Sequence, residues 1–184
     1  MSELINAIEQ KNTTNALQLI HDGCDIGYFD AYGSTILMIA CYSKMPEVAL
    51  ALIATGNAKL DHVNVYGNTA LIYACDRKLL DVALALIANG NAKPEHVNNN
   101  HETAIIYACM NNMPKVAMAL IATGKSNAKY INNFGCAALI LAKHNKMIDV
   151  IDAIENYDVH MSQINKSIQL NPFDDPNYVM EIII

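Results

Sequence analysis

The sequence predicts an all-α solenoid built from stacked helix-turn-helix units. The main observation is internal repetition, because segments 30–63, 64–97 and 98–131 align without gaps at a period of 34 residues. A weaker copy covers 132–164, and residues 1–29 match half of a further copy that would cap the stack. Helices this short are marginal on their own, so each copy must bury its apolar face against its neighbours.

Each copy divides in the same way. A polar turn such as Asp30-Ala31-Tyr32-Gly33 opens it, and a threonine then provides an N-cap for a short apolar helix. The predicted caps are Thr35, Thr69 and Thr103. Ala137 takes this place in the fourth copy, where the missing cap should cost about 1 kcal/mol. A second, alanine-rich helix is predicted to end at Gly56, Gly90 and Gly124.

The pattern G-x-T-A-L-I-x-A-C…V-A-x-x-L-I-A-x-G-N-A resembles the ankyrin repeat, and Gly67 to Cys75 matches it best. The resemblance covers about 1–164 and implies an ankyrin-repeat solenoid. The sequence as a whole also resembles the ankyrin arrays of amoeba-infecting giant viruses.

The chain departs from the family pattern in three ways, one of which is a loop one residue longer than usual before each new turn in the three central copies. The histidine of the family's T-P-L-H is replaced by Met38, Ile72, Ile106 and Ile140. We therefore expect the loop-to-loop hydrogen bond of that histidine to be lost and apolar packing to replace it. The glycine that follows the first helix in the family is replaced by Lys44, Lys78, Asn112 and Lys146.

The resemblance implies a non-enzymatic scaffold that binds another protein, because ankyrin proteins bind partners with their turn tips and the exposed face of the first helix. Carried over to this chain, the partner-binding residues are Tyr32, Ser34, Tyr42, Tyr66, Asn68, Asp76, Arg77, Asn100, Glu102, Met110, Asn111, Phe134 and His144. Tyr32, Tyr66 and Phe134 share one tip position. Their rings either supply contact area to a partner or pack on the next turn, and both roles are compatible.

Composition argues against other classes of function. The apolar fraction of 53% supplies a continuous core, whereas a net charge of −6 with Arg77 as the only arginine disfavours nucleic acid. No apolar run is long enough to cross a membrane. There is no phosphate-binding glycine loop or catalytic motif, so we expect neither enzymatic activity nor a cofactor.

The cysteines and histidines do not indicate a metal site. Cys41, Cys75 and Cys109 recur inside apolar runs, which indicates buried thiols and a reducing, cytoplasmic location. Equivalent thiols of adjacent repeats should lie about 8–10 Å apart, too far to share one ion. His62 and His96 are expected to be solvated loop residues.

The segment 165–184 breaks the period and ends in an apolar stretch. It could fold as a cap over the last repeat, or it could dock a second protein or a second copy of the chain. Two other functions therefore stay open, namely a self-associating structural protein and a regulatory or substrate-adaptor subunit. The partner is an unknown protein, and it would be a host protein if the viral resemblance holds.

Overall fold

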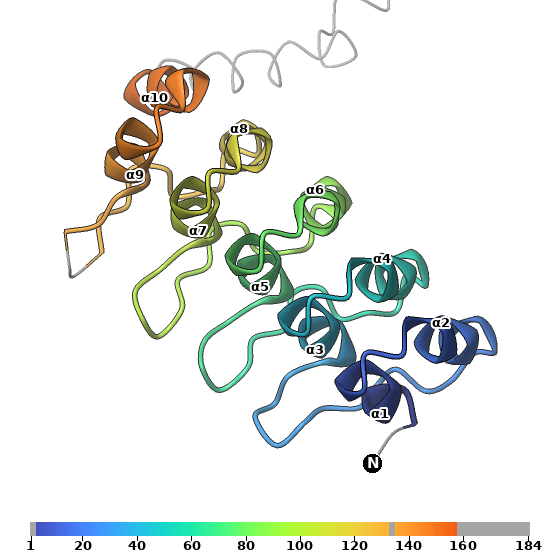
Figure 1. The fold of residues 1–184 in the computed structure, drawn as a ribbon. Coiled ribbons are helices and arrows are strands. Elements are labelled where there is room, and N and C mark those ends of the chain that lie inside the picture. Colours follow the sequence, from blue (N-terminus) through green and yellow to red (C-terminus); the bar gives the residue numbers. More distant parts are fainter. Residues whose placement is uncertain (1–2, 133–134, 158–184) are drawn as a thin grey trace, which may run out of the picture.

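The computed structural model describes residues 3–132 and 135–157, so the tail at 165–184 and Phe134 lie outside the described residues. Ten α-helices form the described part of the chain (Figure 1). They are α1 (Glu3–Glu9), α2 (Thr13–His21), α3 (Ile36–Tyr42), α4 (Pro46–Ala54), α5 (Ala70–Asp76), α6 (Leu80–Asn89), α7 (Ala104–Met110), α8 (Pro114–Ala122), α9 (Ala138–His144) and α10 (Ile148–Glu155). Within these residues no strand is formed beyond isolated bridges at the bases of three turns.

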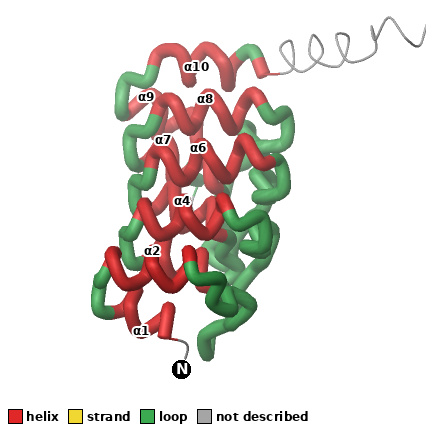
Figure 2. The backbone as a smooth tube through the Cα atoms, turned by 90° about the vertical axis from the view of Figure 1, so that its right-hand side faces the viewer, coloured by secondary structure: helices red, strands yellow, loops and turns green. Residues whose placement is uncertain are grey.

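The helices form two layers. Each odd-numbered helix packs on the next odd-numbered one, and each even-numbered helix packs on the next even-numbered one. Figure 2 shows the even-numbered helices stacked side by side as an outer layer, with the long turns projecting along one edge. This is the predicted all-α solenoid of helix-turn-helix units.

The predicted N-caps are confirmed. The hydroxyls of Thr35, Thr69 and Thr103 accept hydrogen bonds from the backbone N–H three residues later, at 3.2, 3.2 and 3.4 Å. Ala137 provides no side-chain cap for α9, as expected. The positions of these caps set where each inner helix begins, and therefore how far each turn reaches beyond the stack.

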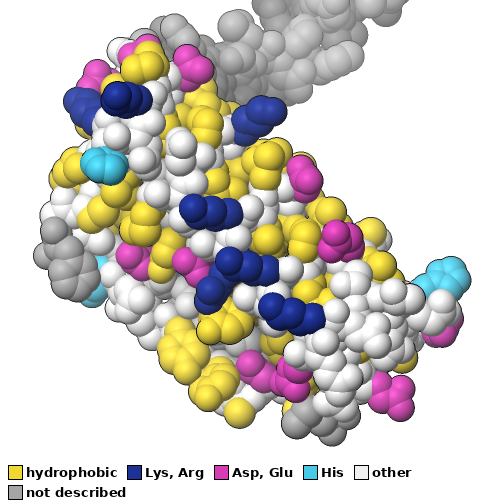
Figure 3. Space-filling model, in the orientation of Figure 1, with side chains coloured by type: hydrophobic (Ala, Val, Ile, Leu, Met, Phe, Trp, Pro, Cys, Tyr) yellow, Lys and Arg dark blue, Asp and Glu magenta, His cyan; other side chains and the backbone are white. Residues whose placement is uncertain are grey.

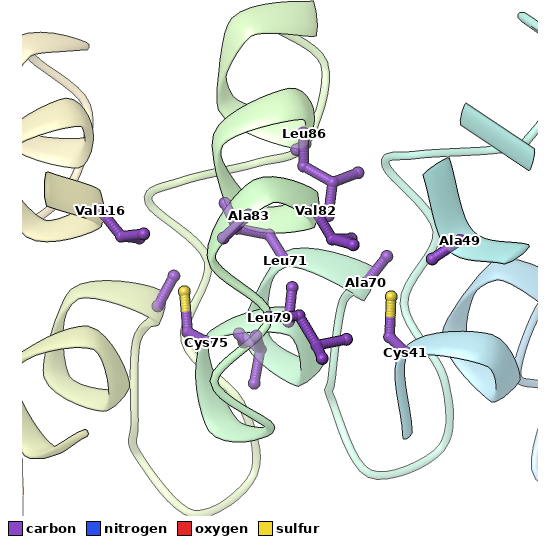
Figure 4. Packing of buried hydrophobic residues seen from close by; sticks show 14 of the residues in the cluster. Cys41, Ala49, Ala70, Leu71, Cys75, Leu79, Val82, Ala83, Leu86 and Val116 are labelled. Atoms are coloured by element: carbon purple, nitrogen blue, oxygen red, sulfur yellow. The ribbon is translucent and has the colours of Figure 1, made fainter. Parts of the chain in front are cut away.

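The core runs through the interfaces between repeats. Met38, Ile72 and Ile106, which stand at the family's histidine position, are at most 1% exposed, so apolar packing does occupy that place. Figure 4 shows Val82 and Leu86 of α6 over α5, while Cys41 and Cys75 lie between successive repeats. All three cysteines of the recurring position are buried, as predicted.

The turn between the two helices of a repeat uses a left-handed residue that is not glycine. Lys44, Lys78, Asn112 and Lys146 have φ values of 56, 63, 54 and 56°. Each of these residues carries a backbone strain that glycine would not, of about 1–2 kcal/mol. The bend is kept because the apolar residue that follows, Met45 for example, then points into the core.

Candidate functional site

Each long turn is organised by one side chain at its first residue. The Asp30 carboxylate accepts hydrogen bonds from the backbone N–H of Tyr32 at 2.8 Å and of Ser34 at 2.7 Å. Asn64 repeats this with Tyr66 and Asn68 at 3.1 and 3.0 Å. Asn98 does the same in the third turn. The tips are therefore held by local bonds and are rigid enough to present side chains in a fixed direction.

The same asparagines connect one turn to the previous one. Asn64 Nδ2 donates to Ser34 Oγ at 3.1 Å, and Asn98 Nδ2 donates to Asn68 Oδ1 at 2.9 Å. Ser34, one of the predicted partner-binding residues, is only 6% exposed, because its hydroxyl accepts this bond between repeats. Asn68 is half-buried for the same reason.

The expectation that His62 and His96 are solvated loop residues is wrong. His62 Nε2 lies 2.7 Å from the carbonyl oxygen of Gly33, and His96 Nε2 lies 2.9 Å from that of Gly67. Both rings are partly buried, and the His62 ring also packs on Phe29 with centroids 4.7 Å apart. A histidine bond between repeats is thus present, although it comes from the loop before the turn rather than from the first helix.

Backbone bonds join neighbouring tips directly. Val65 N–H donates to the Tyr32 carbonyl at 3.0 Å, and Asn99 N–H donates to the Tyr66 carbonyl at 3.2 Å. This spacing brings the rings of Tyr32 and Tyr66 to a centroid distance of 5.5 Å. They remain 54% and 49% exposed. Each ring therefore packs on its neighbour and still has an exposed face, while its contact with a partner stays a prediction.

A groove of about 590 Å³ lies between these tips and the inner helices α3 and α5. It brings together more than half of the predicted partner-binding residues: Tyr32, Ser34, Tyr42, Tyr66, Asn68, Asp76 and Arg77. Glu9, Asp30 and Tyr73 also line it, although sequence reasoning did not select them. The recurrence of tyrosine at Tyr73 and Tyr107, one repeat apart, was the signal that could have found Tyr73.

Arg77 is held against one wall of this groove. Its guanidinium carbon lies 4.1 Å from the centroid of the Tyr42 ring, a cation–π contact between repeats. Its Nε lies 3.2 Å from Asp76 Oδ2, a charge contact without the alignment of a hydrogen bond. Tyr42 also meets Tyr73 edge-on, with centroids 5.6 Å apart. Four tyrosine rings and a fixed arginine therefore shape one continuous surface.

Figure 3 shows this face of the molecule. Hydrophobic side chains gather at the turn tips of the N-terminal half, acidic side chains lie close by, and Lys and Arg side chains form a row along the stack. Partial burial raises the pKa of the Tyr66 hydroxyl, and the neighbouring Tyr32, Tyr73 and Asp30 raise it further.

The other predicted residues lie elsewhere. Asn111 Nδ2 donates to the carbonyls of Cys75 and Asp76 at 3.0 and 3.1 Å, so it caps α5 of the previous repeat. Asn145 does the same for Cys109 at 2.7 Å. Glu102 accepts a hydrogen bond from the Tyr107 hydroxyl. The remaining members of the described set are exposed outside the groove: Asn100, Met110 and His144.

The described residues do not form a metal site, and the Cys41 thiol is not a reactive one. Among the described residues, no three or more His, Cys, Asp or Glu side chains are grouped so that they could hold a metal ion. Burial raises the pKa of the Cys41 thiol to about 12, which suppresses the reactive thiolate. In the same part of the chain, no helix is both long and apolar enough to cross a membrane.

Two stacked layers of short helices, with a row of rigid turns along one edge, define a repeat scaffold that exposes a continuous surface. The comparison with known families identifies it further, because the model of ankyrin repeats in three copies matches residues 4–98. The chain belongs to the ankyrin-repeat family, whose repeats are generic protein–protein interaction modules and are typically not catalytic. A search of curated proteins found no match.

Proposed function

We propose that this chain is a non-enzymatic recognition module that binds a protein partner in the groove beneath the first two turn tips. The observation that carries the proposal is the pair Tyr32 and Tyr66, whose rings contact each other and are still about half exposed at the edge of the groove. Tyrosines held in one orientation bury large area on binding at a small cost in side-chain entropy.

The fixed geometry of the groove supports the same proposal. The tips are tied by Asp30 and Asn64, while Arg77 is held by Tyr42 and Asp76. A partner would therefore not have to order these groups on binding. The free, largely buried cysteines support the further proposal that the chain works in a reducing compartment such as the cytoplasm.

Selection from a random peptide display library tests the proposal. Wild-type protein should enrich a family of related peptides, and the Tyr32→Ala/Tyr66→Ala variant should bind them at least tenfold more weakly, as expected for interface anchors. Tyr28→Ala is the matched control, because Tyr28 is 42% exposed and does not line this groove. Equal binding of the selected peptides by the double variant would remove the tip tyrosines from the interface.

Self-association is a second candidate, supported by the last repeat. Ile140 is 56% exposed, whereas its counterparts Met38, Ile72 and Ile106 are buried under the next repeat. A second copy that covers this end would bury it. Sedimentation equilibrium of the wild type and of Ile140→Asp separates the outcomes. A concentration-dependent dimer that the substitution abolishes supports the candidate, and a wild-type monomer excludes it.

A further inference from the structure

We propose that the partner segment bound in this groove carries a lysine or arginine side chain, which inserts beside Tyr32 and Tyr66. The inference rests on the proposed function and names the chemistry of its partner. It follows from three observations: a cation already held by the groove, a carboxylate that the fold does not need, and the balance of charge around the open tyrosines.

Arg77 shows how this surface holds a cation. Its guanidinium lies over the Tyr42 ring at 4.1 Å and beside the Asp76 carboxylate at 3.2 Å. An aromatic face and a carboxylate are the two groups that stabilise a partly desolvated guanidinium or ammonium. The other half of the groove contains the same two kinds of group, in the rings of Tyr32 and Tyr66 and the carboxylate of Asp30. The described residues place no Lys or Arg among its lining besides Arg77.

Asp30 carries a negative charge that its structural role does not require. Its Oδ1 accepts from two backbone N–H groups of the turn, and the uncharged side chains of Asn64 and Asn98 perform the same task in the next two turns. Those asparagines also need an amide to donate to the preceding tip. Asp30 opens the first turn of the described stack, and its second carboxylate oxygen is not needed by the turn.

The charge balance of the groove favours a basic occupant. Glu9, Asp30 and Asp76 line it together with the single cation Arg77, which Asp76 already contacts. The whole chain carries a net charge of −6. An acidic partner side chain would meet these carboxylates in a partly desolvated site, whereas a basic one would be attracted during encounter and in the complex.

The test uses the peptides enriched by display, synthesised with acetylated N-termini so that the side chain is the only cation at the contact. We expect a lysine or arginine at one fixed position. Replacing that lysine by acetyl-lysine should weaken binding about tenfold, because acetylation removes both the charge and the cation–π contact.

Asp30→Asn is the matching change in the protein, and asparagine at the equivalent positions shows that the turn accepts it. We expect about threefold to fivefold weaker binding, the upper part of the range for an exposed charge pair. We also expect a shallower dependence of affinity on salt. Asp81→Asn is the control, because it removes the same charge from the exposed start of α6, outside the groove.

Three results would overturn the inference. Enriched peptides anchored by acidic or uncharged residues, but still dependent on Tyr32 and Tyr66, would refute the basic partner and leave the proposed function intact. Equal loss of affinity in Asp30→Asn and Asp81→Asn would mean that only net charge matters. Enrichment of no peptide by the folded wild type would contradict the proposed function as well.

Discussion

Replacing Gly67 by alanine should destabilise the stack far more than the same change at Gly33. Both glycines stand at the same place in their turns, with φ values of +73 and +69°. An alanine at either position adopts the left-handed conformation at a cost of about 1 kcal/mol. A Cβ on Gly33 would have Val65 Cγ1 at 4.0 Å as its nearest neighbour, which is an ordinary contact.

At Gly67 the next turn occupies the space. A Cβ there would lie 2.7 Å from the backbone nitrogen of Asn99 and 2.5 Å from its Oδ1. Asn99 would have to move, and its bonds to the carbonyls of Tyr66 and Val65 at 3.2 and 3.0 Å would be lost or strained. Two such bonds are worth about 2 kcal/mol together, so the total loss at Gly67 should reach about 3 kcal/mol.

Urea denaturation followed by far-UV circular dichroism measures both variants. We expect a loss of about 1 kcal/mol in the free energy of unfolding for Gly33→Ala and about 3 kcal/mol for Gly67→Ala. An equal loss of unfolding free energy in the two variants would refute the reasoning. It would mean that the tips of the second and third turns can separate without loss of stability.

Three further changes test other parts of the structure. Ser126 is fully buried with an unpaired hydroxyl where Ala92 stands in the previous repeat, so Ser126→Ala should stabilise the chain by about 1 kcal/mol in urea denaturation. Ala137→Thr should add the missing N-cap of α9 and also stabilise by about 1 kcal/mol, and a loss of stability would contradict the cap assignment. With a thiol reagent at pH 8, only the partly exposed Cys24 and Cys136 should react in the native protein, while all 5 cysteines should react in denaturant. Burial raises the pKa of all five thiols, and it excludes the reagent from Cys41, Cys75 and Cys109.

Features that depend on one repeat could be predicted from the sequence. The threonine caps, the buried cysteines and the apolar replacement of the family's histidine all follow from residue type and helical spacing. These features involve residues a few positions apart, or faces that any stacked neighbour would cover. The partner-binding role of the selected residues stays a prediction, although the groove brings most of the N-terminal ones together.

Features that depend on contact between repeats could not be predicted. His62 and Gly33 are 29 residues apart, whereas Asn111 and Cys75 are 36 apart, so neither pair coincides with the period of 34. Whether such residues meet depends on how far each repeat is displaced from the last. The available signal was the recurrence of a polar side chain, since His62 and His96 occupy equivalent loop positions. A polar residue that recurs in a solenoid is as consistent with a bond between repeats as with exposure to water.

The contacts between repeats also explain why recognition should lie at the N-terminal end. At the position that follows the inner helix, Asn111 and Asn145 each cap the preceding helix through backbone carbonyls, which fixes the frame and leaves little side chain for a partner. Arg77, at the equivalent position, contacts the Tyr42 ring of the preceding repeat instead of capping its helix. Tyrosine rings and the Asp76 carboxylate therefore line this interface between repeats. Arg77 and Tyr42 are among the residues that line the groove between the first two full repeats. The proposed partner site therefore lies at the repeat pair in which Arg77 replaces the capping asparagine.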